Sequence, residues 1–123
     1  VKVAVAAAAR DGTGRGGFRG VHSYEGHLHH TIWAERTAAA HTIYDKVLKL
    51  VAEIEAKVAV NEIITSGTPA FAHALSYEPW KKLPKHQVHS ISPGTVIFHD
   101  LAGELQNGEC VDLVPAAVLM SKV

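Results

Sequence analysis

The residues best suited to chemistry are Ser66, Gly67 and Thr68, which directly follow the apolar and β-branched run Val60–Thr65. Such a run predicts a buried strand. Thr68 before Pro69 predicts a helix that starts with threonine at its N-cap and proline at its first position. Backbone N–H groups at a helix N-terminus bind phosphate, and a glycine lets the ligand approach closely. The pattern therefore predicts a phosphate-binding turn, with a plain capped turn as the alternative.

Two further segments suit an anionic group. Gly94 and Thr95 follow a short predicted strand, Val88–Ile91, and again combine glycine with a hydroxyl. Arg15 lies in the loop Gly12–Gly17, where glycines surround its guanidinium. A guanidinium binds anionic oxygen atoms well, whereas the usual loop arginine is simply solvated. Both segments are candidates for contacts to a phosphate ligand.

The stretch from His22 to His30 is the richest in possible ligands. A zinc site needs several ligands that converge in a tetrahedral shell, and the histidine spacing here matches no standard pattern. Tyr24, at the end of the predicted strand Phe18–Tyr24, is better placed to contact a ligand, and His27 could assist it. The alternatives are a histidine-based metal site, or a core tyrosine with solvated histidines. Structural or surface roles are expected for His41, His73, His86, His89 and His99.

Several classes of function lose support from composition and missing motifs. Twelve basic and twelve acidic residues cancel, so neither a nucleic acid nor a membrane is expected as a partner. No apolar run approaches the roughly 18 residues of a membrane span. The single cysteine, Cys110, and the lack of a leader pattern lead us to expect a cytoplasmic protein. Motifs of common hydrolases and nucleotide-binding proteins are also missing.

The remaining pattern predicts the elements that position these residues. Apolar residues recur at steps of three and four across Trp33–Lys57 and predict an amphipathic helix. Strands that alternate with helices favour parallel βα units. A closed (β/α)₈ barrel takes about 250 residues, so this chain supplies about half of one. The other expected elements are a buried strand at Val1–Ala9, a short helix from Thr68 to Tyr77, a loop at Pro79–Lys85, a strand at Thr95–His99 and a strand within Val111–Val123.

Three motifs, in order along the chain, resemble one known family. They are Phe18–Leu28, Glu62–Pro69 and Ser92–Asp100. They are similar to motifs of the D-threonine aldolase and D-serine dehydratase family, which belongs to the alanine-racemase-like, fold-type III pyridoxal-phosphate enzymes. The resemblance implies a parallel (β/α) barrel beside a β-domain, with pyridoxal phosphate at the C-terminal mouth of the barrel. Residues 1–110 would then be part of the second half of the barrel, and residues 111–123 the start of the crossing into the β-domain.

The resemblance also implies roles for individual residues. Arg15 matches the arginine of a glycine-rich loop near the cofactor ring, Tyr24 matches a ring-contacting residue, and His27 belongs to the same motif. The residues that match the two phosphate-binding segments are Ser66, Gly67, Thr68, Gly94 and Thr95.

Three departures from the family pattern stand out. Arg10 occupies a position where the family usually has an acidic residue, and almost no room for a helix remains between Gly17 and Phe18. The Schiff-base lysine of the family has no counterpart in this chain. The family also implies a divalent metal, whose ligands lie in the β-domain and not in this chain.

The expected function is that of a pyridoxal-phosphate lyase acting on D-3-hydroxy amino acids, by retro-aldol cleavage or by dehydration. The substrate would be a small D-amino acid, and a homodimer is left open. Two alternatives remain at this point. One is an amino-acid racemase of the same barrel group, and the other is a non-catalytic module that binds a phosphate ligand.

Overall fold

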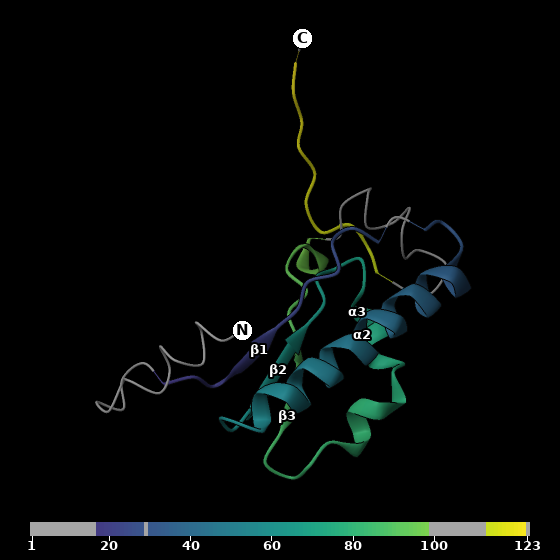
Figure 1. Cartoon of the computed structure of the whole chain (residues 1–123). Coiled ribbons are helices and arrows are strands. Elements are labelled where there is room, and N and C mark those ends of the chain that lie inside the picture. The colour runs from purple at the N-terminus through teal and green to yellow at the C-terminus, as the bar shows by residue number, and fades with distance from the viewer. Residues whose placement is uncertain (1–16, 29, 99–112, 123) are drawn as a thin grey trace.

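The chain forms a small α/β domain with a three-stranded parallel sheet (Figure 1). A computed structural model describes residues 17–28, 30–98 and 113–122. The strands lie in the order β1-β2-β3, and both neighbouring pairs are parallel. The α/β class expected from the sequence is therefore confirmed. The strands are β1 (Gly20–His22), β2 (Glu62–Thr65) and β3 (Val88–Ile91).

Helix α2 (Trp33–Glu55) confirms the strongest prediction from the sequence and ends two residues before the expected Lys57. Its inward residues recur at steps of four and three, so they form one stripe along the helix. Burying a large aliphatic side chain contributes about 1.5–3 kcal/mol, so this stripe is what fastens α2 to the sheet. The buried residues of the stripe are Ala40, Tyr44, Val47, Val51 and Ile54.

The second connection differs from the expected helix and loop. Thr68 and Pro69 form a turn, and α3 (Phe71–Leu75) begins later, with Ala70 at its N-cap and no side-chain cap. The predicted N-cap at Thr68 is therefore wrong. The expected loop after α3 contains a 3₁₀ helix, η1 (Glu78–Lys82), which places Trp80 in the core. Burial of the Trp80 side chain favours this helical turn. The loop-forming residue types in the segment do not reveal that contact.

Two expected strands are wrong where the structure describes them. Thr95–Ile97 form a 3₁₀ helix, η2, and residues 113–122 have no regular structure. A strand needs a neighbour that pairs with its backbone. Among the described residues, the segment 113–122 forms one backbone hydrogen bond, from the N–H of Ala116 to the carbonyl of Phe98. The expected strand Val1–Ala9 and the loop carrying Arg15 lie outside the described residues.

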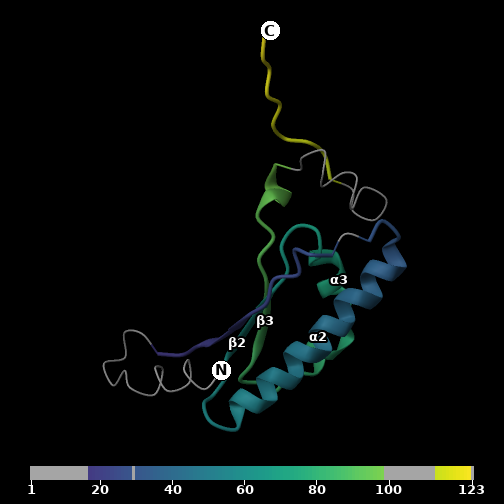
Figure 2. The same cartoon turned by 45° about the horizontal axis from the view of Figure 1, so that its top comes forward.

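Both helical connections lie on the same side of the sheet (Figure 2). Alternate strand residues face that side, and Ile63 and Thr65 of β2 are fully buried there. Three rings, those of Tyr44, Tyr77 and Trp80, pack together beneath it with centroids 5.0–5.6 Å apart. The core therefore lies between the sheet and its helices. No helix in the described ranges has the length and apolar character needed to cross a bilayer.

Candidate functional site

The candidate site lies where the three parallel strands end. Ser23–Glu25 follow β1, Ser66–Thr68 follow β2 and Ser92–Thr95 follow β3. The carboxyl ends of neighbouring parallel strands share one edge of a sheet, which is where α/β proteins bind ligands. The fold therefore brings together three segments that are far apart in the sequence.

The two predicted phosphate-binding segments contact each other. The Oγ1 of Thr68 accepts hydrogen bonds from the Oγ1 of Thr95 and from the backbone N–H of Val96, each 3.0 Å long. Thr68 is buried, whereas Thr95 is exposed. The side chain of Thr68, which was expected to cap a helix, instead joins the segment after β2 to the segment after β3.

Backbone donors remain available around this contact. Among the described residues, no backbone carbonyl accepts a hydrogen bond from the N–H of Gly67, Gly94 or Thr95. A Cβ placed on Gly94 would meet no atom within 4 Å, so the space next to it is open. Unpaired N–H groups beside open space can bind the oxygen atoms of an anion. These donors are the feature of the site that best fits a phosphate group.

Ser66 has a left-handed backbone, with φ of 66°. Its side chain is fully buried, and its Oγ lies 2.9 Å from the Oη of Tyr44 and 3.1 Å from the Oγ1 of Thr65, to which it donates. The left-handed conformation costs a non-glycine residue about 1–2 kcal/mol, and these contacts hold it in place. Ser66 therefore shapes the loop from inside, with its hydroxyl bound to other protein groups.

The ring of Tyr24 covers this loop. It lies against Gly26 on one edge and Gly67 on the other, and a Cβ on either glycine would overlap it. The ring is 64% exposed, so its other surface is open to a ligand. Gly67 was expected to let a ligand approach the backbone closely. In this structure the ring of Tyr24 makes that close approach instead.

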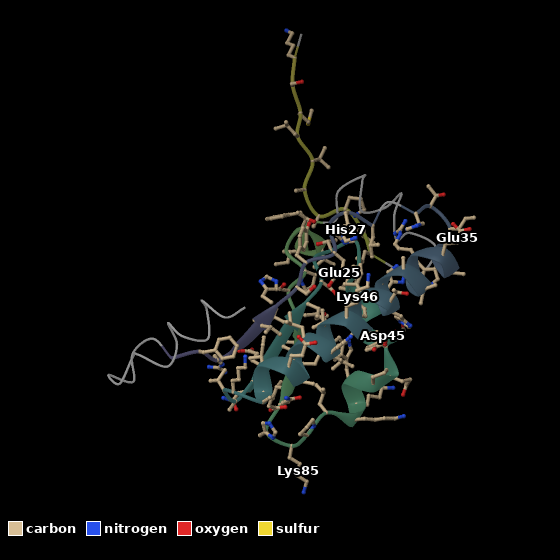
Figure 3. The ribbon with its side chains drawn as sticks, viewed as in Figure 1. Glu25, His27, Glu35, Asp45, Lys46 and Lys85 are labelled. Carbon is tan, nitrogen blue, oxygen red and sulfur yellow. The ribbon has the colours of Figure 1, made fainter. Side chains whose placement is uncertain are left out.

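Glu25 is the residue of this site that the sequence reasoning missed. Its side chain is 1% exposed, and neither carboxyl oxygen has a hydrogen-bond partner in the described part of the chain. Burial raises the pKa of the Glu25 carboxyl, and the nearby polar groups of Ser66 and Ser23 oppose that rise in part without forming hydrogen bonds of normal geometry. The available signal was a carboxylate directly after Tyr24 at the end of a strand. Figure 3 shows Glu25 and His27 in the segment that follows β1.

A hydrogen-bonded chain continues from Ser66 into the core. The Oγ1 of Thr65 lies 2.8 Å from the Nε2 of His89, whose ring stacks on Trp80 at 4.2 Å. Burial lowers the pKa of His89 to about 4, so this ring is neutral near pH 7. The structural role expected for His89 is consistent with these contacts.

The opposite face of the sheet carries His22. Its Nε2 lies 3.4 Å from the Oγ of Ser92, beside a cavity of about 290 Å³ lined by β1 and β2. Ser92 also donates its backbone N–H to the carbonyls of Thr65 and Ser66. The cavity therefore reaches the same end of the sheet as the loop of Ser66.

The other predicted residues are not brought to this point. Arg15 lies outside the described residues, and His27 is exposed in the turn after Glu25. All lysines in the described ranges are exposed, and none follows the carboxyl end of a strand. Within those ranges no group of three histidine, cysteine, aspartate or glutamate side chains could hold a metal ion.

Comparisons of this chain with protein-family models, with curated proteins and with solved structures gave no match. The functional argument therefore depends on the geometry of the strand ends and on the three sequence motifs. Both lead to the same segments, Ser66–Thr68 and Gly94–Thr95.

Proposed function

We propose that this chain is the phosphate-binding part of a pyridoxal-phosphate lyase acting on D-3-hydroxy amino acids. The observation that carries the proposal is the contact between Thr68 and Thr95. It joins two segments that the motif resemblance assigns independently to phosphate binding. The free N–H groups of Gly67, Gly94 and Thr95 lie in these same segments.

The sheet topology supports a barrel as the complete fold. Strand order follows chain order, and both connections cover the same face, as in a singly wound barrel. In a doubly wound sheet the helices would cover both faces. Parallel sheets are normally buried on both faces, yet here Val88 of β3 is 57% exposed. Further strands that close the barrel would bury this open face.

Different residues of the described part would contact different parts of the cofactor. The N–H groups of Gly67, Gly94 and Thr95 would bind the phosphate, while Thr68 keeps the two segments together. Tyr24 offers an aromatic surface above the loop. When bound, pyridoxal phosphate serves as the electron sink for breaking a bond at the substrate α-carbon. The part of the protein described here would bind and orient the cofactor.

Catalysis would need groups from elsewhere in the protein. The lysine that carries the cofactor in the enzymes that the motifs resemble has no equivalent among the described lysines, which are all exposed; Lys85, before β3, lies at the end of the domain away from Glu25 (Figure 3). This observation favours a second candidate function, a non-catalytic module that binds a phosphate ligand. A racemase of the same barrel group would use the same cofactor site.

The test uses the full-length protein. The lyase proposal expects it to bind pyridoxal phosphate with visible absorbance and to release glycine from D-threonine, or ammonia from D-serine. Pyridoxal without the phosphate should bind much more weakly, because the N–H groups would have no anion to hold. Binding without turnover would favour the non-catalytic module, and racemisation of D-alanine would favour a racemase. Equal binding of pyridoxal and its phosphate would contradict the phosphate site.

A further inference from the structure

The buried carboxyl of Glu25 is the most unusual group near the loop after β2. A buried acidic side chain is normally paired or hydrogen-bonded, yet neither oxygen of Glu25 has a hydrogen-bond partner among residues 17–28, 30–98 and 113–122. Glu25 also takes part in none of the ion pairs among the described residues. These pairs join Arg19 to Glu62, Lys81 to Glu78 and His86 to Glu55. No cation among the described residues therefore offsets its charge.

The groups that face Glu25 come from three elements. Ser23 precedes it on its own segment, Ser66 faces it from the end of β2, and Tyr44 faces it from α2. Of these only Tyr44 is titratable, and burial together with the charge on Glu25 raises the pKa of its phenol. The surroundings of Glu25 thus contain polar but uncharged groups, and it is the burial of the carboxyl that favours its protonated form, while Ser66 and Ser23 oppose this effect in part.

Glu25 faces the loop after β2, which contains one of the proposed phosphate-binding N–H groups, that of Gly67. Ser66, which faces the carboxyl, is directly followed by Gly67, whose N–H donates to no backbone carbonyl among the described residues. Two like charges a few ångströms apart in a partly buried site repel strongly enough to change binding by about tenfold or more. A dianion on this loop and a charge on Glu25 therefore disfavour each other.

We propose that Glu25 is a specificity-determining residue that takes up one proton from solvent when a phosphate dianion binds at the Ser66–Thr68 and Gly94–Thr95 segments. The inference depends on the proposed phosphate site. It adds a condition for binding there, namely that Glu25 is uncharged when the dianion is bound. The carboxylate accepts the proton and becomes a neutral acid, while the phosphate keeps both charges. At a pH where Glu25 is ionised in the free protein, binding of the dianion therefore takes up one proton.

Titration calorimetry with inorganic phosphate tests the proposal. The experiment is run on the full-length protein in buffers of different ionisation enthalpy, at a pH where Glu25 is ionised in the free protein. The dependence of the binding heat on the buffer counts the protons taken up. Glu25→Gln, which is neutral and similar in shape, should take up fewer protons than the wild type by as much as one.

The same variant has an expected effect on affinity. Glu25→Gln should bind phosphate about tenfold more tightly than the wild type at high pH, with the difference vanishing at low pH. The matched control is Glu35→Gln, which removes an exposed carboxylate from the first turn of α2. This control should match the wild type in both proton uptake and affinity.

A measurement on the wild type covers the case in which Glu25→Gln does not fold. Infrared difference spectra should show the C=O stretch of a protonated carboxylic acid when phosphate is added. Phosphate binding without this band, or with equal proton uptake in the wild type and Glu25→Gln, would overturn the role of Glu25 and leave the phosphate site intact. No phosphate binding at all would overturn both.

Discussion

The Oη of Tyr44 lies 2.9 Å from the Oγ of Ser66, so the middle of helix α2 holds the left-handed residue at the end of β2. Both groups are fully buried. The contact connects the packing of a predicted helix to the geometry of the predicted site. The loop is therefore shaped by a residue 22 positions away in the sequence.

Replacing Tyr44 with phenylalanine should weaken phosphate binding as well as stability. The change leaves the Ser66 hydroxyl with one partner fewer in a buried place, which costs about 1–3 kcal/mol. Denaturant unfolding measures the stability, and calorimetry with inorganic phosphate measures the affinity. Tyr77→Phe is the matched control, because it removes a hydrogen bond from a neighbouring ring to Asp45 and leaves the contact between Tyr44 and Ser66 in place. It should lower stability alone, and an equal loss of affinity in both variants would contradict the positioning role of Tyr44.

Replacing Thr68 with valine should loosen the two segments that we propose to bind phosphate. Valine keeps the shape but removes the acceptor for Thr95 and for the N–H of Val96. Affinity for inorganic phosphate should fall about tenfold, which corresponds to about 1.4 kcal/mol. Thr42→Val, which removes a hydroxyl from the exposed surface of α2, should leave affinity unchanged. Unchanged affinity in Thr68→Val would show that the contact is not needed for binding.

Replacing Gly67 with alanine should displace the ring of Tyr24. The new methyl group would overlap the ring, and because the ring is largely exposed it can swing aside at a cost of about 1 kcal/mol. A double-mutant cycle with Tyr24→Ala measures the effect, since that change should remove most of the cost. Gly94→Ala is the control, because it enters open space at a negative φ and should leave stability unchanged. If Gly67→Ala is equally destabilising in the Tyr24→Ala background, a group other than the Tyr24 ring must obstruct the new methyl group.

Stability should fall as the pH is lowered from about 6.5 to about 4. Burial, with smaller contributions from Arg36 and His41, lowers the pKa of His73 from its ordinary 6.5 to about 4, and burial alone does so for His89. In this window the unfolded chain binds more protons than the folded one, so unfolding becomes easier as the pH falls. The contribution of His73 is on the order of 3 kcal/mol at about 1.4 kcal/mol per pKa unit.

Denaturant unfolding at a series of pH values checks this prediction. His73→Gln should be less stable near pH 7 but should show a flatter dependence on pH between 6.5 and 4. His27→Gln, at an exposed histidine, should keep the wild-type slope. A wild-type stability that stays constant across the window would show that neither buried histidine resists protonation.

The sequence predicted the elements whose side-chain pattern repeats over several residues. Helix α2 follows from apolar residues at steps of three and four, and β2 from a β-branched run before a glycine. The helix start at Thr68 was wrong because the hydroxyl finds better partners in Thr95 and Val96, across the sheet edge. The strand at Thr95–His99 was wrong over its described part for a related reason, since that segment turns into η2 at the same contact.

The sequence by itself determined the α/β class and helix α2, because these depend on local pattern and residue type, and it predicted the two segments that we propose to bind a phosphate. Only the tertiary structure decided that Thr68 would join those segments, that Tyr24 would cover Gly67, and that Glu25 would be buried with no hydrogen-bond partner among the described residues. The physical reason is that parallel pairing brings the ends of β1, β2 and β3 to one edge. Contacts made there depend on residues tens of positions apart, and no local pattern specifies them.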